Sequence, residues 1–393
     1  MAGKTAKRLW FGCLITFLAL SWVLPSLALA AEPYKLGAVF SVTGNGSMLG
    51  DPEKKTVEML VDKINAGGGI NGVPLKVIIY DDESDATKCT LAVKRLITED
   101  KVLAVMGPSL SGLSMAVVPL AESNKTPLVS CAASYKIVWD EKANKPYHWV
   151  FKTPQSDSLA VEAIYAHMKK KGIHKIAILT ATDGFGQSGR QELVRIAGLK
   201  DSGIEIIADE KYGPKDTDLT AQLTKIKGLN PQAIVNWSIG PVQVVALRNA
   251  KDLGIKVPFY QSHGFGNRNN IKLAVGAAEG VYVPLGACNI DDILPANNPQ
   301  KAVTTEYAKM YKAKYNEPLS SFGGHAWDAL YLLVNALKTA GPDKAKIRDA
   351  LENTKGFVGQ HGIFNMSPQD HNGLTKDAFT MVEVKGNDWA LAD

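Results

Sequence analysis

The chain has 393 residues, 46% of them apolar, and a formal net charge of +5. This length is too great for one hydrophobic core and natural for two domains. Four cysteines exclude a disulfide scaffold, and outside the first residues no basic run suggests nucleic-acid binding.

The first thirty residues predict a secretory signal peptide. Lys4, Lys7 and Arg8 precede an uncharged apolar run at 9–24, and Ala28-Leu29-Ala30 follows as a small-residue cleavage site. The run is shorter than the ~20 residues that span a bilayer, so we expect cleavage near Ala30 rather than a membrane anchor. Export from the cytoplasm would separate the mature chain from NAD and reducing thiols.

Strands and helices alternate along the rest of the chain. Strands are expected at 35–40, 77–80, 102–106 and 127–130, with helices after Asp51 and around 89–97. The pattern restarts with strands at 175–181, 204–208, 233–237 and 258–261, and with helices up to about 200, at 217–228 and at 241–253. A later amphipathic helix carries Trp327, Leu330, Tyr331, Val334 and Leu337. These repeats predict two doubly wound α/β lobes.

Three cysteines, Cys89, Cys131 and Cys288, remain after cleavage. At most one disulfide can form among them, and none has the spacing of a zinc site. We expect them to be small buried core residues.

Four consecutive segments resemble one family. LGAVFSVTGNGSMLGD, INAGGGINGVPLKVIIYDDESD, VLAVMGPSLSG and PLVSCAAS are similar to segments of the periplasmic proteins that deliver branched-chain amino acids to ABC transporters. The resemblance implies two lobes joined by three crossovers around a ligand cleft, with lobes at 31–153 plus 286–377 and at 154–285 plus 378–393. It also implies a monomer without a cofactor, whose partners are a small carboxylate ligand, a membrane permease and cytoplasmic ATPases.

The loops after two strands of the first lobe predict a carboxylate site. They are rich in small and hydroxyl residues, and a helix N-terminus beside them favours anions. The resemblance implies that the Ser111 and Ser134 hydroxyls and the Ala132 backbone hold the carboxylate, next to Ser109 and Leu110. Ser111 could instead only cap the helix that follows it.

The second lobe departs from the family pattern. His263 stands where the family has an acidic side chain for the ligand's ammonium group, and Leu49 and Ile239 stand where it has aromatic residues. Phe185 and Phe322 keep aromatic side chains at their positions. The first expectation is a branched-chain or other hydrophobic amino acid, and the alternative is an amine-free aromatic or aliphatic carboxylate. His263 could also be a loop histidine that faces solvent.

Two other classes of function compete with this interpretation. Gly184, Gly186 and Gly189 spell G-x-G-x-x-G, and Asp209 follows at the distance typical of dinucleotide binding. An exported NAD-dependent oxidoreductase is therefore an alternative, although export separates it from NAD and we expect no enzyme. A receptor domain of the same fold would normally continue into a transmembrane helix, so we expect a free carrier. No G-x-S-x-G or H-E-x-x-H motif supports a hydrolase or a metal site.

Overall fold

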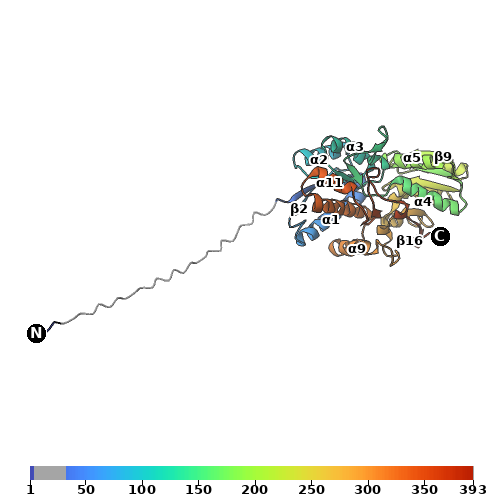
Figure 1. Cartoon of the computed structure of the whole chain (residues 1–393). Coiled ribbons are helices and arrows are strands. Elements are labelled where there is room, and N and C mark those ends of the chain that lie inside the picture. Colours follow the sequence, from blue (N-terminus) through green and yellow to red (C-terminus); the bar gives the residue numbers. More distant parts are fainter. Residues whose placement is uncertain (4–31, 393) are drawn as a thin grey trace. The chain divides into compact units, whose positions relative to one another are not determined.

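The computed structural model of the chain describes residues 1–3 and 32–392, and residues from Pro33 onward form one compact unit. The predicted signal peptide and its cleavage site lie outside the described residues. Figure 1 shows the order of the elements along the chain.

The first lobe is built on a parallel five-stranded sheet of order β2-β1-β3-β4-β7. Its strands are β1 (Tyr34–Phe40), β2 (Leu75–Asp81), β3 (Val105–Met106), β4 (Leu128–Ser130) and β7 (Val150–Lys152). Its helices are α1 (Ser47–Ala66), α2 (Ala86–Thr98), α3 (Ser111–Ser123), α9 (Lys301–Tyr315), α10 (Ser321–Ala340) and α11 (Lys344–Glu352). Buried, near-continuous apolar strands such as β1 are typical of a parallel sheet covered on both faces.

The second lobe contains a seven-stranded sheet of order β16-β15-β12-β11-β10-β8-β9. Its strands are β8 (Lys175–Ala181), β9 (Glu205–Tyr212), β10 (Ala233–Trp237), β11 (Phe259–Gln261), β12 (Tyr282–Leu285), β15 (Thr380–Lys385) and β16 (Asp388–Leu391). Its helices are α4 (Asp157–Lys170), α5 (Gly184–Ala197), α6 (Thr220–Gly228), α7 (Val242–Asp252) and α8 (Arg268–Leu273). The first five strands in chain order are parallel, and the hairpin β15–β16 joins the edge antiparallel.

Two further strand pairs lie outside the main sheets. They are β5 (Trp139–Asp140) with β6 (Lys145–Pro146), and β13 (Phe357–Val358) with β14 (Ile363–Phe364). The predicted architecture of two doubly wound lobes is confirmed. The residues at which the chain crosses between the lobes stay a prediction.

The late amphipathic helix, α10, forms the centre of the first lobe's core. Trp327, Leu330, Leu333 and Leu337 are almost fully buried there with residues of β1 and α1. Although most of the chain separates α10 from β1, the two pack together. The C-terminal part of the chain therefore belongs to the core of the first lobe. Burial of each such side chain stabilises the fold by about 1.5–3 kcal/mol.

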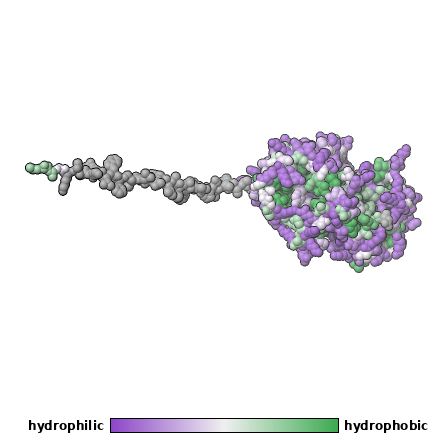
Figure 2. All heavy atoms as spheres, turned by 60° about the horizontal axis from the view of Figure 1, so that its bottom comes forward, coloured by the Kyte–Doolittle hydropathy of each residue, from purple (hydrophilic) through white to green (hydrophobic). Residues whose placement is uncertain are grey.

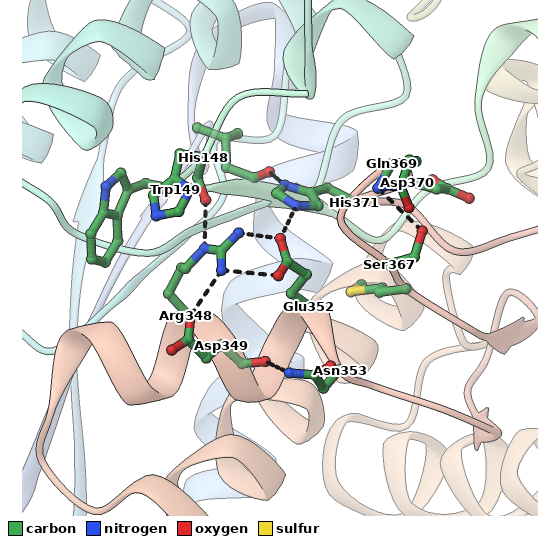
Figure 3. Close-up of polar contacts among 12 residues, drawn as sticks. His148, Trp149, Arg348, Asp349, Glu352, Asn353, Ser367, Gln369, Asp370 and His371 are labelled. Atoms are coloured by element: carbon green, nitrogen blue, oxygen red, sulfur yellow. Dashed lines mark hydrogen bonds and ion pairs between the residues drawn. The ribbon is translucent and has the colours of Figure 1, made fainter. Parts of the chain in front are cut away.

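A polar cluster fastens α11 and the segment after β14 to the edge strand β7 (Figure 3). Arg348 donates from Nε to the carbonyl oxygen of His148 at 2.9 Å and forms an ion pair with Glu352. The ring of His371 bonds to Glu352 at 3.1 Å and to the carbonyl oxygen of Val150 at 2.9 Å. The backbone N–H of Lys152 donates to the carbonyl oxygen of His371 at 3.2 Å. The late segment thus covers the otherwise open edge of the first sheet.

Cys89, Cys131 and Cys288 are all buried and unpaired in the described part of the chain. This confirms their prediction as small core residues. On the face drawn in Figure 2, hydrophilic residues predominate, and apolar residues lie among them in small groups. Among the described residues, no helix combines the length and the apolar character that crossing a bilayer requires.

Candidate ligand-binding site

Two adjoining cavities, which share Leu110, Ser111, Phe185 and Ile239, lie where loops of the two lobes meet, and the smaller one contains most of the predicted site residues. The loops after β3 and β4 contribute from the first lobe, and the loops after β8, β10 and β11 from the second. The space between the protein atoms of this smaller cavity is about 540 Å³, counting its open side. Nine residues proposed from the sequence line it: Leu49, Ser109, Leu110, Ser111, Ala132, Phe185, Ile239, His263 and Phe322.

The serine-rich loops of the first lobe are held together by hydrogen bonds. The N–H of Ser134 donates to Ser111 Oγ at 3.3 Å, and the N–H of Ala132 donates to Ser130 Oγ at 3.1 Å. Ser111 is the first residue of α3, and the first turn of a helix leaves N–H groups without an intrahelical acceptor. Ser111 and the start of α3 therefore lie at the cavity, and their role as an anion site stays a prediction.

Ser134 has a different position from the other expected residues. It lies outside the cavity lining, and its hydroxyl bonds to that of Ser188 on α5 at 2.6 Å. A second bond between the lobes runs from Ser321 Oγ, on α10, to the carbonyl oxygen of Gly266 at 3.1 Å. The structure therefore shows the lobes in contact around the cavity.

His263 lies in an aromatic surrounding and does not face solvent. Its ring centroid is 5.2 Å from that of Phe185, 5.7 Å from Trp237 and 5.4 Å from Phe379. Neither ring nitrogen has a hydrogen-bond partner among the described residues. His263 begins a short helical turn directly after β11, so the parallel sheet places it at the cavity.

Two further histidines line the cavity, and they are not among the site residues proposed from the sequence. His325 belongs to α10, and His361 lies between β13 and β14. Their rings stack with centroids 3.6 Å apart. Phe379, just before β15, was also missed. In the sequence, only the position of His325 close to Phe322 gave a signal for any of them.

Asp328, which is outside the cavity lining, forms hydrogen bonds with one member of this histidine pair, His361. The carboxylate is fully buried and accepts hydrogen bonds from the N–H groups of Gln360 at 2.6 Å and His361 at 3.1 Å. His361 Nδ1 lies 3.2 Å from the same carboxylate. Burial raises the pKa of Asp328, while the bonds from His361 and the backbone oppose that rise.

Enclosure keeps two of the histidines neutral. Burial lowers the pKa of His263 to about 3, and the neighbouring side chains of Lys152 and His361 contribute to the same shift. Burial also lowers the pKa of His325, with contributions from His361, His263 and Lys152. At neutral pH, both rings are therefore uncharged donors and acceptors.

This shift predicts a pH-dependent stability. Because the pKa of His263 is lower in the folded state than the ordinary 6.5, the unfolded state binds a proton more readily below that pH. The neutral His263 ring makes its full contribution to the free energy of unfolding above pH 6.5. This contribution decreases as the pH falls towards 3. Between about pH 7.5 and pH 5 the loss is roughly 2 kcal/mol.

We expect His263→Phe to remove this part of the pH dependence. Urea unfolding of both proteins at the two pH values measures it: the wild type should lose about 2 kcal/mol more than the variant. Equal losses in the two proteins would mean that His263 is protonated in the folded state.

The G-x-G-x-x-G motif serves packing in this structure. A Cβ on Gly186 would lie 2.1 Å from the carbonyl oxygen of Ala181, and one on Gly189 would lie 2.1 Å from the Trp237 indole. Asp183 caps α5 by accepting from the N–H of Gly186 at 2.8 Å. The helix N-terminus that would bind a pyrophosphate thus faces a carboxylate.

Asp209, the carboxylate that would bind a ribose in a dinucleotide site, is also held by another side chain. Asp209 accepts from Arg190 Nε at 2.9 Å, and the two side chains form an ion pair. Both halves of the dinucleotide fingerprint therefore have structural roles within the second lobe.

Comparison with known proteins decides the family. The profile of the periplasmic binding protein family matches residues 33–388. The chain belongs to this family. Its members are non-enzymatic components of transporters, so the resemblance proposed from the sequence is confirmed and the oxidoreductase alternative is wrong.

Curated relatives and solved structures agree with this assignment. The chain is 26% identical to the leucine-, isoleucine-, valine-, threonine- and alanine-binding protein of Pseudomonas aeruginosa, covering 83% of this chain and 84% of that one. It is 27% identical to the Leu/Ile/Val-binding protein of Escherichia coli K12, covering 88% of each.

Among solved structures, an extracellular ligand-binding receptor from Rhodopseudomonas palustris HaA2 matches with a TM-score of 0.85 and 30% identity, over 92% of this chain and 100% of that one. The Streptococcus pneumoniae branched-chain amino acid binding protein in complex with isoleucine matches with a TM-score of 0.77 and 28% identity, over 92% and 99%. The chain is thus a solute-binding protein of the branched-chain amino acid family of ABC transporters.

Proposed function

We propose that this protein is exported to the periplasm and closes around a small carboxylate that has no α-ammonium group. It then presents the closed form to a membrane permease and its ATPases. The observation that carries the proposal is the composition of the cavity wall: among the described residues that line it, no side chain is acidic.

An ammonium group enclosed in this cavity would lack a counter-charge. Burying an unpaired charge is strongly unfavourable unless a carboxylate or several acceptors replace its water. Lys152 contributes to lowering the pKa of both His263 and His325. The nearest acidic side chains, Glu53 and Asp328, lie behind the lining, where they bond to Ser109 and His361. The carboxylate of a ligand, in contrast, has the first turn of α3 and the Ser111 hydroxyl to receive it.

The remaining walls suit an apolar body. Phe185, Phe322 and Phe379 line the cavity from three different parts of the chain. Their ring faces and edges can pack against a flat ring or a branched aliphatic chain. Closing the lobes on such a body removes apolar surface from water, which gives the closed state the additional affinity that drives closure.

A hydrophobic amino acid is the second candidate, and the names of the relatives favour it. The proteins from Pseudomonas aeruginosa and Escherichia coli are named as binding leucine, isoleucine and valine. In this case a neutral His263 would have to accept a hydrogen bond from the ammonium group in place of a carboxylate.

Matched pairs of ligands separate the two candidates. Calorimetric titration of residues 31–393 would compare leucine with 4-methylpentanoate and phenylalanine with 3-phenylpropanoate, which differ only in the ammonium group. We expect the amine-free acid of a pair to bind at least about a hundredfold more tightly, equivalent to ~2.7 kcal/mol. Tighter binding of the amino acids would overturn the proposal.

A variant pair tests the carboxylate end. Ser111→Ala should weaken binding of the acid about tenfold, since a hydrogen bond to a charged group contributes about 1.5–3 kcal/mol. Ser123→Ala, at the exposed far end of the same helix, is the control and should leave affinity unchanged.

A further inference from the structure

The hydrogen-bonding state of His361 follows from its contacts with Asp328. Two backbone N–H groups converge on the Asp328 side chain, so its oxygens act as acceptors. With this carboxylate ionised, the ring atom His361 Nδ1, 3.2 Å from one of its oxygens, carries the hydrogen. In the neutral ring, Nε2 is then left with a lone pair and no hydrogen.

That lone pair has no partner in the described part of the chain. His361 Nε2 is buried and makes no hydrogen bond, although the residue lines the cavity. A Cβ on Gly286 would lie 3.2 Å from His361 Cδ2, and one on Gly324 would lie 2.7 Å from Cε1. Glycine at both positions leaves the edge that contains Nε2 uncovered by their side chains. A buried acceptor without a donor destabilises the protein by about 1–3 kcal/mol.

We propose that His361 Nε2 accepts a hydrogen bond from a hydroxyl group of the ligand, so that the substrates are small carboxylic acids with a hydroxyl at a distance from the carboxylate. The proposal rests on the proposed function, since it assumes that Ser111 and the start of α3 hold the carboxylate. His361 and His325 come from other elements than those loops, and so form a separate wall of the cavity.

A hydroxyl suits this wall better than other polar groups because it both donates and accepts. Its hydrogen would go to His361 Nε2, and its oxygen could accept from His325 or His263, which also have ring nitrogens without partners among the described residues. An ether oxygen only accepts, and would face the Nε2 lone pair without a hydrogen between them.

A ligand series on the wild-type protein tests this directly. Calorimetric titration near pH 8 would compare 3-phenylpropanoate with derivatives that have a hydroxyl group at position 3 or 4 of the ring. Derivatives with a methoxy group at the same ring positions would be compared as well. The aliphatic pair 4-methylpentanoate and 4-hydroxy-4-methylpentanoate would be run alongside. We expect one hydroxy acid to bind roughly 10- to 100-fold more tightly than its parent and its methoxy counterpart.

The outcomes distinguish this inference from the proposed function. Binding of the amine-free acids without a preference for a hydroxyl, or with methoxy and hydroxy forms equal, overturns the role of His361 and leaves the proposed function standing. Binding of amino acids alone overturns both. Nitrogen NMR of the histidine rings gives an independent test, because a hydrogen on His361 Nε2 in the ligand-free protein would contradict the assignment.

Variants separate recognition from packing. His361→Phe keeps an aromatic ring beside His325 but removes Nε2, so the preference for the hydroxy acid should fall below about threefold while the parent acid still binds. His148→Phe, at an exposed histidine of the first lobe, is the matched control and should keep the full preference. An unchanged preference in His361→Phe would overturn the proposal, and circular dichroism would verify that both variants fold.

Discussion

Replacing Gly184 with alanine is expected to weaken ligand binding roughly 10- to 100-fold without destabilising the ligand-free protein. Gly184 begins α5 in the second lobe, and a Cβ there would lie 2.7 Å from the backbone nitrogen of Gly112 and 2.8 Å from its Cα. Gly112 belongs to α3 of the first lobe. The added methyl group therefore obstructs this contact between the lobes, which we expect to form when they close.

Gly112→Ala is the matched control. A Cβ on Gly112 would have room, since it would be no closer than 3.9 Å to Gly184. Neither glycine has a positive φ, so alanine fits the backbone at both positions. Titration with one ligand and thermal unfolding without ligand would measure the two effects. Equal affinities for the two variants would show that the lobes do not meet at Gly184 in the bound state.

Comparing Gly184→Ala with Gly112→Ala separates the free energy of closing the lobes from the free energy of the contacts between the ligand and the cavity. Gly184 is outside the lining of the cavity that contains His263 and Ser111, so its substitution removes no group from that site. A ligand favours closure only by the difference between its affinities for the two states. A clash that is present only in the closed state raises the free energy of that state. The free energy of ligand binding becomes less favourable by the same amount.

Strands and helices with a clear pattern of apolar residues could be predicted from the sequence. The strands predicted at 175–181 and 233–237 agree with β8 and β10 because each is a mostly apolar run that is buried along its length except at Lys175. The strand predicted at 102–106 is shorter in the structure: Leu103 and Ala104 still bond to β1, but regular pairing covers only Val105–Met106.

Elements with a weak apolar signal were missed. α9 is rich in lysine and buries only Thr304, Tyr307 and Tyr311. β12 contains a proline, which argues against a strand inside a sheet.

The same limit applies to the site. The family resemblance pointed to Ser111 and His263, and their positions after strands agree with it, because the carboxyl ends of parallel strands meet at one edge of a sheet. The pair Asp328–His361 could not be placed from the sequence, because these residues are 33 positions apart and meet only when the segment after β13 packs on α10. That packing depends on tertiary contacts which no local pattern contains.

Asp328→Ala is expected to lower the free energy of unfolding by about 3–5 kcal/mol, a large part of the stability of an ordinary domain. The substitution leaves the N–H groups of Gln360 and His361 buried without their acceptor, and each unsatisfied donor costs about 1–3 kcal/mol. It also opens space in the first lobe's core.

Asp343→Ala provides the comparison, since it makes the same chemical change at an exposed residue that caps α11 by accepting from the N–H of Lys346 at 3.0 Å. Loss of such a cap costs about 1 kcal/mol. Urea unfolding of the wild type and both variants at one pH would measure the difference. A similar small loss in both would mean that water or a rearranged segment satisfies the Gln360 and His361 donors. In that case Asp328 would not fix the orientation of the His361 ring, and the hydroxyl preference inferred from that ring would lose its structural basis.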